Sequence, residues 1–349
     1  MRTILTLLRD VIAFSNQFFP HPIALLRSYR FSPADLAIES PAKDQSTQQL
    51  PLTTIDVLSY NVNNEAVHHP TRRRRILRAI FSSGARIILL QETNPSWEEL
   101  LREDAVALEF AYTYFHHPGR SDRKAGGSAI LSQFPLDFDK IQMFDFSDNI
   151  SGSVFPSMVC DVTIPIKPMM GSSKATTSTQ VCNSNNVTIT IANIHLRPPV
   201  NLDGSAWLDT ARKTEPIRIH EVKELLRRSQ ESQRTIDIIA GDFNEGDAGG
   251  AIMHLISKGY TNALSQYVPR RKETHRWNYF GKVWQLRKRL DHILWHSDVL
   301  SSTKREEDCR LKLDCINCGV LSGYENNASD HQPILSRFAI NMRMDAKFK

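Results

Sequence analysis

Four acidic residues border short hydrophobic segments, where their carboxylates could share one cation. Glu92 follows RIILLQ, and Asp242 follows IDIIAG. Asp291 lies in LDHILW, and Asp330 lies in ASDHQP ahead of the hydrophobic residues 334–340. Mg²⁺ and Mn²⁺ prefer oxygen ligands such as these. We therefore expect a site for Mg²⁺ (or Mn²⁺) that is assembled from distant parts of the chain.

Amide and imidazole side chains occupy similar positions. Asn61 in SYNVN and Asn244 in GDFN add amide groups, and His195 in NIHLRPP and His331 in SDHQP titrate near neutrality. A metal can polarise a phosphoryl oxygen, a carboxylate can orient or deprotonate water, and Asn and His can bind non-bridging oxygens. A carboxylate paired with His331 would keep its imidazole protonated. The residues therefore suit attack by water on a phosphate ester.

Alternating strands and helices must position these residues, because polar clusters follow the hydrophobic segments. In α/β proteins, loops at strand ends commonly carry such groups on a rigid sheet. A Ser/Thr/Asn-rich stretch at 171–186 predicts a hairpin insertion. The expected strands are 55–60, 86–90, 128–131, 154–164, 187–196, 236–240, 290–295 and 334–340, and the expected helices are 72–83, 96–110, 214–230 and 248–257.

The composition is that of a folded protein and excludes several other classes of activity. Of the 349 residues, 41% are hydrophobic and 23% charged, with a net charge of +5, which excludes a disordered chain. The sequence has no Gly-rich phosphate loop with Lys, no G-x-S-x-G and no H-E-x-x-H. Nucleotide-driven phosphoryl transfer, serine hydrolysis and zinc proteolysis are therefore not indicated.

The N-terminal residues form a separate extension. Residues 4–19 have the periodicity of an amphipathic helix, which predicts peripheral membrane contact or docking on the domain. Arg9 and Asp10 interrupt the hydrophobic run, so a secretory signal is not favoured. Residues 33–53 are polar and predict a linker. We expect a monomer inside the cell, with an organelle as an open alternative.

Residues 270–290 are strongly basic and also aromatic. Eight basic residues stand against one acidic residue, Glu273, which gives a local charge of +7. Basic and aromatic side chains together suit a nucleic-acid strand or another polyanion. We expect Arg276 and Trp277 to bind substrate, because the segment leads directly to Asp291. The alternative is a positive hairpin that only offsets the site carboxylates.

Seven motifs occur in one order and together resemble a known superfamily. They are SYNV, LLQET, GGSAILS, NIHL, GDFN, RLDHI and SDHQP, and this order resembles the endonuclease/exonuclease/phosphatase superfamily. The resemblance covers about residues 54–341 and implies a metal-dependent phosphoric ester hydrolase. It also implies a four-layered α/β (α+β) sandwich of two mostly antiparallel sheets flanked by helices. The division is then an N-terminal extension at 1–53, a catalytic domain at 54–341 and a tail at 342–349.

The resemblance also implies metal ligands. Glu92 would be the principal metal carboxylate, with Asn61 beside it and Asp330 near the metal or its waters. Asn63 stands where some members carry an Asp that helps with metal. Arg197, two residues after His195, would add positive charge.

The remaining site residues would act on the water and the phosphate. Asp242 would position the attacking water, and Asn244 would hold a phosphate oxygen. His331 would contact the scissile phosphate, with Asp291 fixing its protonation. His195 matches the His that the deoxyribonuclease-like branch places on the phosphate. The alternative for His195 is a structural histidine satisfied within the sheet.

The substrate stays open among three hypotheses. The first is hydrolysis of nucleic acid or a nucleic-acid adduct, favoured because N-I-H-L resembles the deoxyribonuclease and tyrosyl-DNA phosphodiesterase branches. The second is a lipid-directed or small-molecule phosphoesterase held at a membrane. It is weakened for phosphoinositides because the W-x-G-D-x-N signature is missing, with Ala240 before Gly241, and P-A-W-C-D-R is absent. The third is a catalytically silent binding module, disfavoured because no expected site residue is replaced.

Overall fold

The computed structural model describes most of the chain after the N-terminal extension. It describes residues 52–107, 110–118, 124–150, 152–166, 185–200, 210–268, 272–279, 284–297, 311–321 and 328–342. The predicted amphipathic helix at 4–19 and nearly all of the predicted linker and insertion lie outside these residues. The first strand begins at Thr53 and the last ends at Met342, and the three-part division stays a prediction.

Two six-stranded sheets form the centre of the structure. Each is antiparallel apart from one parallel pair, β1 with β2 in the first and β7 with β8 in the second. In order, the first sheet contains β13 (Leu311–Val320), β14 (Ile334–Met342), β1 (Thr53–Asn61), β2 (Ile87–Thr93), β4 (Gly127–Ser132) and β3 (Tyr112–His116). The second contains β5 (Gln142–Phe144), β6 (Ser157–Pro165), β7 (Asn186–His195), β8 (Ile238–Asp242), β12 (Asp291–His296) and β9 (Tyr260–Asn262).

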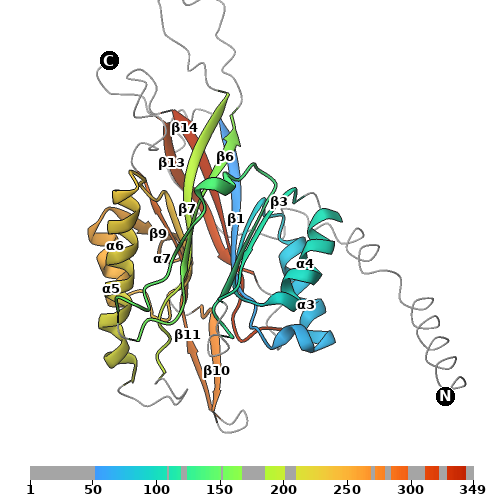
Figure 1. The fold of residues 1–349 in the computed structure, drawn as a ribbon, viewed down its shortest axis with the longest axis vertical. Helices are drawn as coiled ribbons and strands as arrows, with labels where there is room; N and C mark the ends of the chain where they lie inside the picture. Colours follow the sequence, from blue (N-terminus) through green and yellow to red (C-terminus); the bar gives the residue numbers. More distant parts are fainter. Residues whose placement is uncertain are drawn as a thin grey trace, which may run out of the picture.

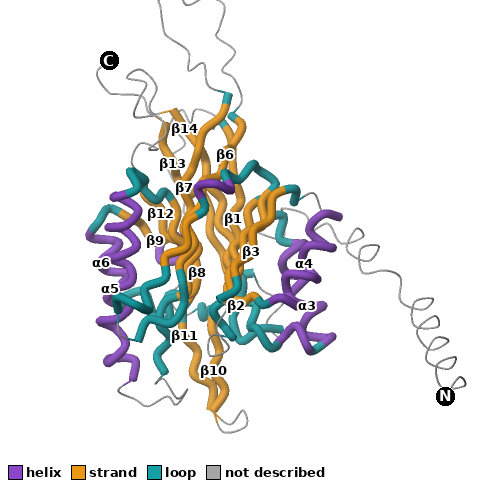
Figure 2. Tube along the Cα trace, in the orientation of Figure 1, coloured by secondary structure: helices purple, strands orange, loops and turns teal. Residues whose placement is uncertain are grey.

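Helices cover the outer faces of both sheets and complete four layers (Figures 1 and 2). The first sheet carries α3 (Pro70–Ser82) and α4 (Pro95–Ala107), and the second carries α5 (Thr210–Glu231) and α6 (Gly250–Ser257). The short helices are η2 (Ala66–His68), η3 (Phe138–Lys140) and α7 (Ala263–Tyr267). This arrangement confirms the four-layered sandwich. No described helix is long and apolar enough to cross a bilayer.

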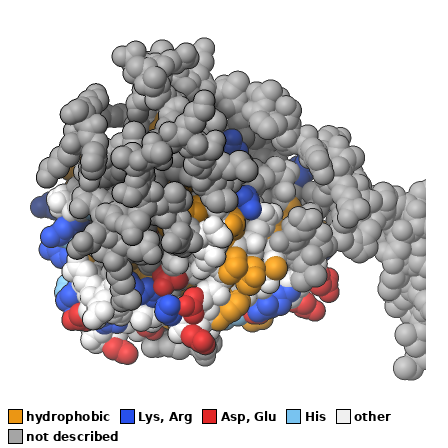
Figure 3. Space-filling model, turned by 90° about the horizontal axis from the view of Figure 1, so that it is seen from above, with side chains coloured by type: hydrophobic (Ala, Val, Ile, Leu, Met, Phe, Trp, Pro, Cys, Tyr) orange, Lys and Arg blue, Asp and Glu red, His pale blue; other side chains and the backbone are white. Residues whose placement is uncertain are grey.

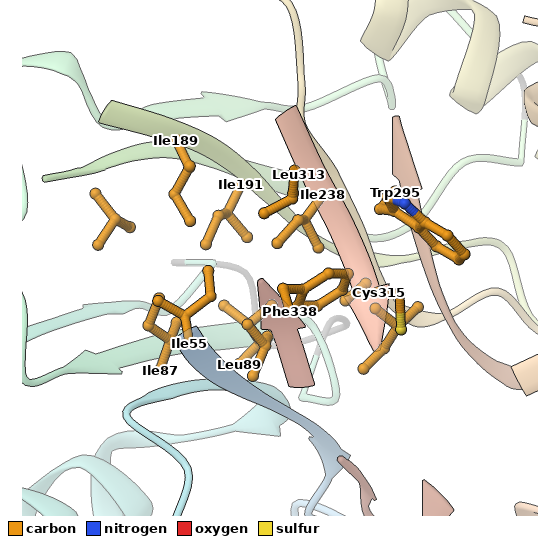
Figure 4. Close-up of a cluster of buried hydrophobic side chains, with 14 of the residues drawn as sticks. Ile55, Ile87, Leu89, Ile189, Ile191, Ile238, Trp295, Leu313, Cys315 and Phe338 are labelled. Carbon is orange, nitrogen blue, oxygen red and sulfur yellow. The ribbon is translucent and has the colours of Figure 1, made fainter. Parts of the chain in front are cut away.

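The alternation of side chains along each central strand builds the core. In β2, Ile87 and Leu89 point between the sheets, whereas Ile88 and Leu90 pack beneath α3 and α4. Ile238 of β8 faces the same inter-sheet core from the opposite side (Figure 4). Because both faces are buried, such strands read as continuous hydrophobic runs.

The strands that the sequence does not reveal are mostly the sheet edges. All eight expected strands and all four expected helices are present. The four sheet strands outside that expectation, β13, β3, β5 and β9, are the outer strands of the two sheets. In β13 polar Lys312 and Asp314 alternate with buried Leu311 and Leu313. An edge strand has fewer neighbours to cover it, so its hydrophobic signal is weaker.

A two-stranded hairpin extends beyond the sandwich. Its strands are β10 (His275–Tyr279) and β11 (Trp284–Lys288), paired antiparallel, and it projects at the lower end of Figure 1. It corresponds to the basic segment at 270–290. Thr274, at its base, is fully buried and its Oγ1 accepts hydrogen bonds from the backbone N–H groups of Leu290 (2.9 Å) and Asp291 (3.0 Å).

One buried amide ties the two sheets together. Asn193 of β7 donates from Nδ2 to the carbonyls of Leu90 (2.9 Å) and Ala129 (3.1 Å) in the first sheet. Its Oδ1 accepts from Gln91 Nε2 at 2.7 Å. A buried polar group without a hydrogen-bond partner lowers the stability of the fold by more than a typical satisfied hydrogen bond raises it. The pairing therefore favours one alignment of the sheets.

We expect Asn193→Ala to lower the free energy of unfolding by about 2–4 kcal/mol, because it removes the closest acceptor of Gln91 and the amide that donates to two carbonyls. Urea denaturation followed by circular dichroism measures the loss. Thr188→Ala, on the same strand but partly exposed, serves as the control and should cost less than about 1 kcal/mol. Equal losses in the two variants would contradict the assignment.

Candidate active site

The strand directions bring the predicted site residues to one end of the sandwich. Asn61 and Glu92 lie at the ends of the parallel strands β1 and β2, and His195 and Asp242 end β7 and β8. Antiparallel β12 starts at the same end with Asp291. The loop before β14 supplies Asp330 and His331, and His331 contacts Asp291.

His331 lies between two buried carboxylates. Its Nδ1 is 2.9 Å from Asp291 Oδ2, and its Nε2 is 3.5 Å from Asp242 Oδ2. Burial alone would lower the pKa of His331, but the charges of Asp291 and Asp242 outweigh it and hold the pKa well above the usual value. The imidazole is therefore a cation with its Nε2–H directed toward Asp242.

His195 faces the carboxylate of Asp242 as well, but its imidazole is neutral. Its Nε2 is 3.6 Å from Asp242 Oδ2, and its ring stacks on Phe155 with centroids 4.2 Å apart. Burial lowers the pKa of His195 to about 4, against the opposing charge of Asp242. One charged and one neutral imidazole thus contact the same oxygen of Asp242.

Glu92 is a carboxylate with unbalanced negative charge around it. Asn61 Nδ2 donates to Glu92 Oε1 (3.0 Å) and to Asp242 Oδ2 (3.2 Å). Desolvation raises the pKa of Glu92 to about 7, and the charge of Asp330 adds to the effect. No arginine or lysine among the described residues forms an ion pair with Glu92. A hard divalent cation would balance this charge, so the donors fit Mg²⁺ or Mn²⁺.

The backbone is unusual at this end of the sandwich. Among the described residues, four non-glycine residues have a positive φ, and three of them, Asn63 (58°), Glu92 (58°) and Asn244 (54°), belong to the site. Asparagine tolerates this conformation, whereas for Glu92 it costs about 1 kcal/mol or more. Such strain is typical of functional positions, because the surrounding structure must enforce it.

The loops after β7 and β8 are joined through Asn244. Its backbone N–H donates to Asp242 Oδ1 at 2.8 Å, and its Nδ2 donates to the carbonyl of Leu196 at 2.9 Å. Asp242 Oδ1 is therefore held by the backbone, and Oδ2 faces the two histidines. These bonds fix the direction of the Asp242 carboxylate.

The loop at 328–332 is fastened to β1. Ser329 Oγ donates to the carbonyl of Asn61 at 2.8 Å, and Asn63 Nδ2 donates to Asp330 Oδ1 at 3.0 Å. Desolvation would raise the pKa of Asp330, but the hydrogen bond from His275 and the charge of His331 keep it well below the usual range. Asp330 therefore carries a negative charge close to Glu92.

His275 belongs to the site although no sequence motif predicts a role for it. Its Nε2 is 3.8 Å from Asp330 Oδ2, and its ring centroid is 4.4 Å from that of His331. An isolated backbone bridge also pairs His275 with His331. The only sequence signal is its place in the basic segment before Asp291, and that signal does not single out one residue.

The side chains of Arg197 and Arg276, which are expected to add charge or bind substrate, are held by neighbouring residues, and the Arg276 backbone N–H donates to the carbonyl of Asp330 at 2.9 Å. Arg197 is 4% exposed and donates from Nη2 to the carbonyl of Val200 at 2.6 Å, so it does not present its charge at an open surface. Arg276 Nη2 donates to Glu273 Oε1 at 3.1 Å. Trp277 lies in β10, and its side chain is outside the described residues.

Comparisons with known proteins agree with the motifs. The model of the "Endonuclease/Exonuclease/phosphatase family" matches residues 58–331. No curated protein matches the chain.

Several solved structures share the fold at low sequence identity. Truncated Caenorhabditis elegans TDP2 is 16% identical, with a TM-score of 0.50 over 82% of this chain and 97% of that one. D. rerio TDP2 complexed with a single-strand DNA product is 15% identical, with a TM-score of 0.52 over 82% and 99%. The human Nocturnin catalytic domain is 17% identical, with a TM-score of 0.50 over 84% and 96%. At such identities the similarity concerns the fold alone.

We expect Asp291→Asn to lower the pKa of His331, because it removes the closest charge that favours the imidazolium. The imidazolium would then lose its proton at a lower pH than in the unaltered protein. NMR titration of the histidine ring signals measures this change. His254, on α6, is the internal reference and should titrate identically in both proteins. An unchanged His331 would show that Asp291 does not control its protonation.

Proposed function

The chain belongs to the endonuclease/exonuclease/phosphatase family and is a phosphoric ester hydrolase, and we propose that it hydrolyses phosphodiester bonds in nucleic acid or a nucleic-acid adduct with a divalent cation. The observation that carries this proposal is the cationic His331 between Asp291 and Asp242, next to the unbalanced carboxylate of Glu92. The same fold in D. rerio TDP2 is seen with a single-strand DNA product, which supports the substrate class. The local charge of +7 at 270–290 supports it too.

Glu92, Asn61 and Asp330 would hold Mg²⁺ or Mn²⁺. Asn61 and Glu92 lie at the ends of the neighbouring strands β1 and β2, and Asp330 is joined to the chain after β1 through Asn63. The charge of Asp330 raises the pKa of Glu92. When bound, the cation would polarise a phosphoryl oxygen and offset the charge that develops on it. His275 would act as a positioning residue, because it contacts Asp330 and His331 together.

The side chains around Asp242 would act on the water and the phosphate. Asp242 would orient the attacking water and accept its proton, since Asn244 and Asn61 fix its direction. The imidazolium of His331 would donate to a non-bridging oxygen, where negative charge develops. Neutral His195 would donate a second hydrogen bond there without repelling His331, and Asn244 would help to hold a phosphate oxygen.

We expect Asp242→Asn and His331→Ala each to lower hydrolysis of the preferred substrate by about 10²–10⁴-fold, because each removes a group that acts in the transition state. The assay would compare single-stranded, nicked and duplex DNA, RNA, a 5′-tyrosyl DNA adduct, sphingomyelin and phosphoinositides. Asp56→Asn, which removes only the exposed ion pair with Arg337, is the control and should keep full activity. Cleavage of sphingomyelin or phosphoinositides without any nuclease activity would overturn the substrate class.

We expect Glu92→Gln to weaken Mn²⁺ binding at least tenfold, because a neutral amide cannot balance the cation as a carboxylate does. Isothermal titration calorimetry measures the binding directly, without reference to activity. The matched variant Glu224→Gln changes a carboxylate on the outer helix α5 and should bind Mn²⁺ like the unaltered protein. Activity that survives a chelator, together with no Mn²⁺ binding, would contradict the proposed cation site.

A further inference from the structure

A cavity lies at the opposite end of the second sheet from the active site. Its volume is about 430 Å³, and it lies between the carboxyl ends of α5 and α6 and the start of β8. Strand β8 runs from this cavity to Asp242, and its five residues span about 17 Å at roughly 3.3 Å each. The cavity is therefore separate from the site described above. Its basic and histidine lining residues are Lys223, Arg227, Arg234, His254, Lys258 and His296.

The lining of this cavity is basic and contains two lysines outside any ion pair of the described residues. None of its lining residues, all within the described part of the chain, is Asp or Glu. Lys223 and Lys258 form no ion pair with described residues. Burial, and then the charges of these two lysines, lower the pKa of His254. A carboxylate beside the lysines would instead raise the pKa of His254, so no neighbouring carboxylate offsets the charge of the lysines.

The arginines of the cavity are held in place by neighbours. Arg227 pairs with Glu224 at 2.8 Å, outside the cavity lining. Arg234 Nη2 pairs with Asp161 at 2.7 Å, while its buried Nε has no hydrogen-bond partner among the described residues. These contacts hold the Arg234 side chain in one position, so its cation would meet a bound anion at little cost in side-chain entropy.

The wall of the cavity near β9 is rigid. The Tyr260 hydroxyl donates to the carbonyl of Ile236 at 2.7 Å, and the Tyr260 and His296 rings meet edge to face at 5.1 Å.

Seen from above, lysine, arginine and histidine side chains gather at the left edge of the molecule, the side on which α5 and α6 lie (Figure 3). Elsewhere in that view, basic, acidic and hydrophobic side chains are interspersed.

Helix dipoles explain part of this charge and leave a surplus. Each helix end carries about half a negative charge, which one nearby cation offsets. Two helices end here; Arg228 lies in the last turn of α5, and Lys258 caps α6. Arg227 and Arg234 are balanced by Glu224 and Asp161, so Lys223 remains as the surplus charge among the described residues of the lining.

We propose that this cavity is a second binding site for a phosphate group, carried by inorganic phosphate or by a small phosphate monoester. A dianion with several acceptor oxygens suits cationic donors that converge from two helices and the chain before β8. The volume is within the range of small-ligand sites and too small for a folded partner. The site does not depend on the hydrolytic activity, because none of its residues belongs to the active site.

Calorimetric titration with inorganic phosphate, adenosine 5′-monophosphate and adenosine tests the proposal. The proteins are the full chain, the double variant Lys223→Gln/Lys258→Gln, and the control Lys312→Gln, which changes an exposed lysine on β13. The variant His331→Ala, which removes the proposed phosphate contact of the active site, is titrated in parallel. Circular dichroism confirms that each protein is folded.

The full chain and Lys312→Gln should bind phosphate alike, and His331→Ala should keep the binding at the cavity. The double variant should bind phosphate at the cavity at least tenfold more weakly. Adenosine should not bind. If phosphate and adenosine 5′-monophosphate bind with equal affinity, inorganic phosphate is a sufficient ligand. If the monophosphate binds more tightly, the ligand is a phosphate monoester. Both results support the proposal. Loss of phosphate binding in His331→Ala but not in the double variant would overturn it, as would equal binding of adenosine and its monophosphate.

Discussion

The alignment of the two sheets is the constraint on which the site depends. Asn61 and Glu92 come from the first sheet, whereas Asp242 and Asp291 come from the second. The 3.2 Å contact between Asn61 and Asp242 exists only if both sheets end at the same level. Asn193 is the buried polar link between them. Within each sheet, a slip of one residue in the pairing of a strand would turn its side chains to the other face and separate these groups.

Burial then assigns different charges to chemically similar groups. His195 and His331 contact the same oxygen of Asp242, yet only His331 has a second carboxylate, Asp291, within hydrogen-bond distance. Burial has the larger effect on the pKa of His195 and lowers it, whereas the two carboxylates have the larger effect on the pKa of His331 and raise it. The resulting pair can contact a phosphate without the repulsion that two imidazolium groups would suffer.

The central strands and the acidic motifs were predictable because their causes are local. A strand buried on both faces must be hydrophobic throughout, and a site on a strand end must follow it directly in sequence. The edge strands β13, β3, β5 and β9 were missed because their burial is incomplete. His275 was missed because its proximity to Asp330 arises from the pairing of distant segments.

The family, the central strands and the types of residue that could act on a phosphate ester can be predicted from the amino-acid sequence, since motif order and hydrophobic runs are properties of the chain. Which groups meet, and in which charge state, follows only from the folded structure. It buried Arg197 against Val200 rather than at an open surface, and it placed His275 beside His331. It also gathered Lys223, Arg234 and Lys258 around one cavity. These outcomes depend on distances across the fold and on desolvation, and neither is encoded by spacing along the chain.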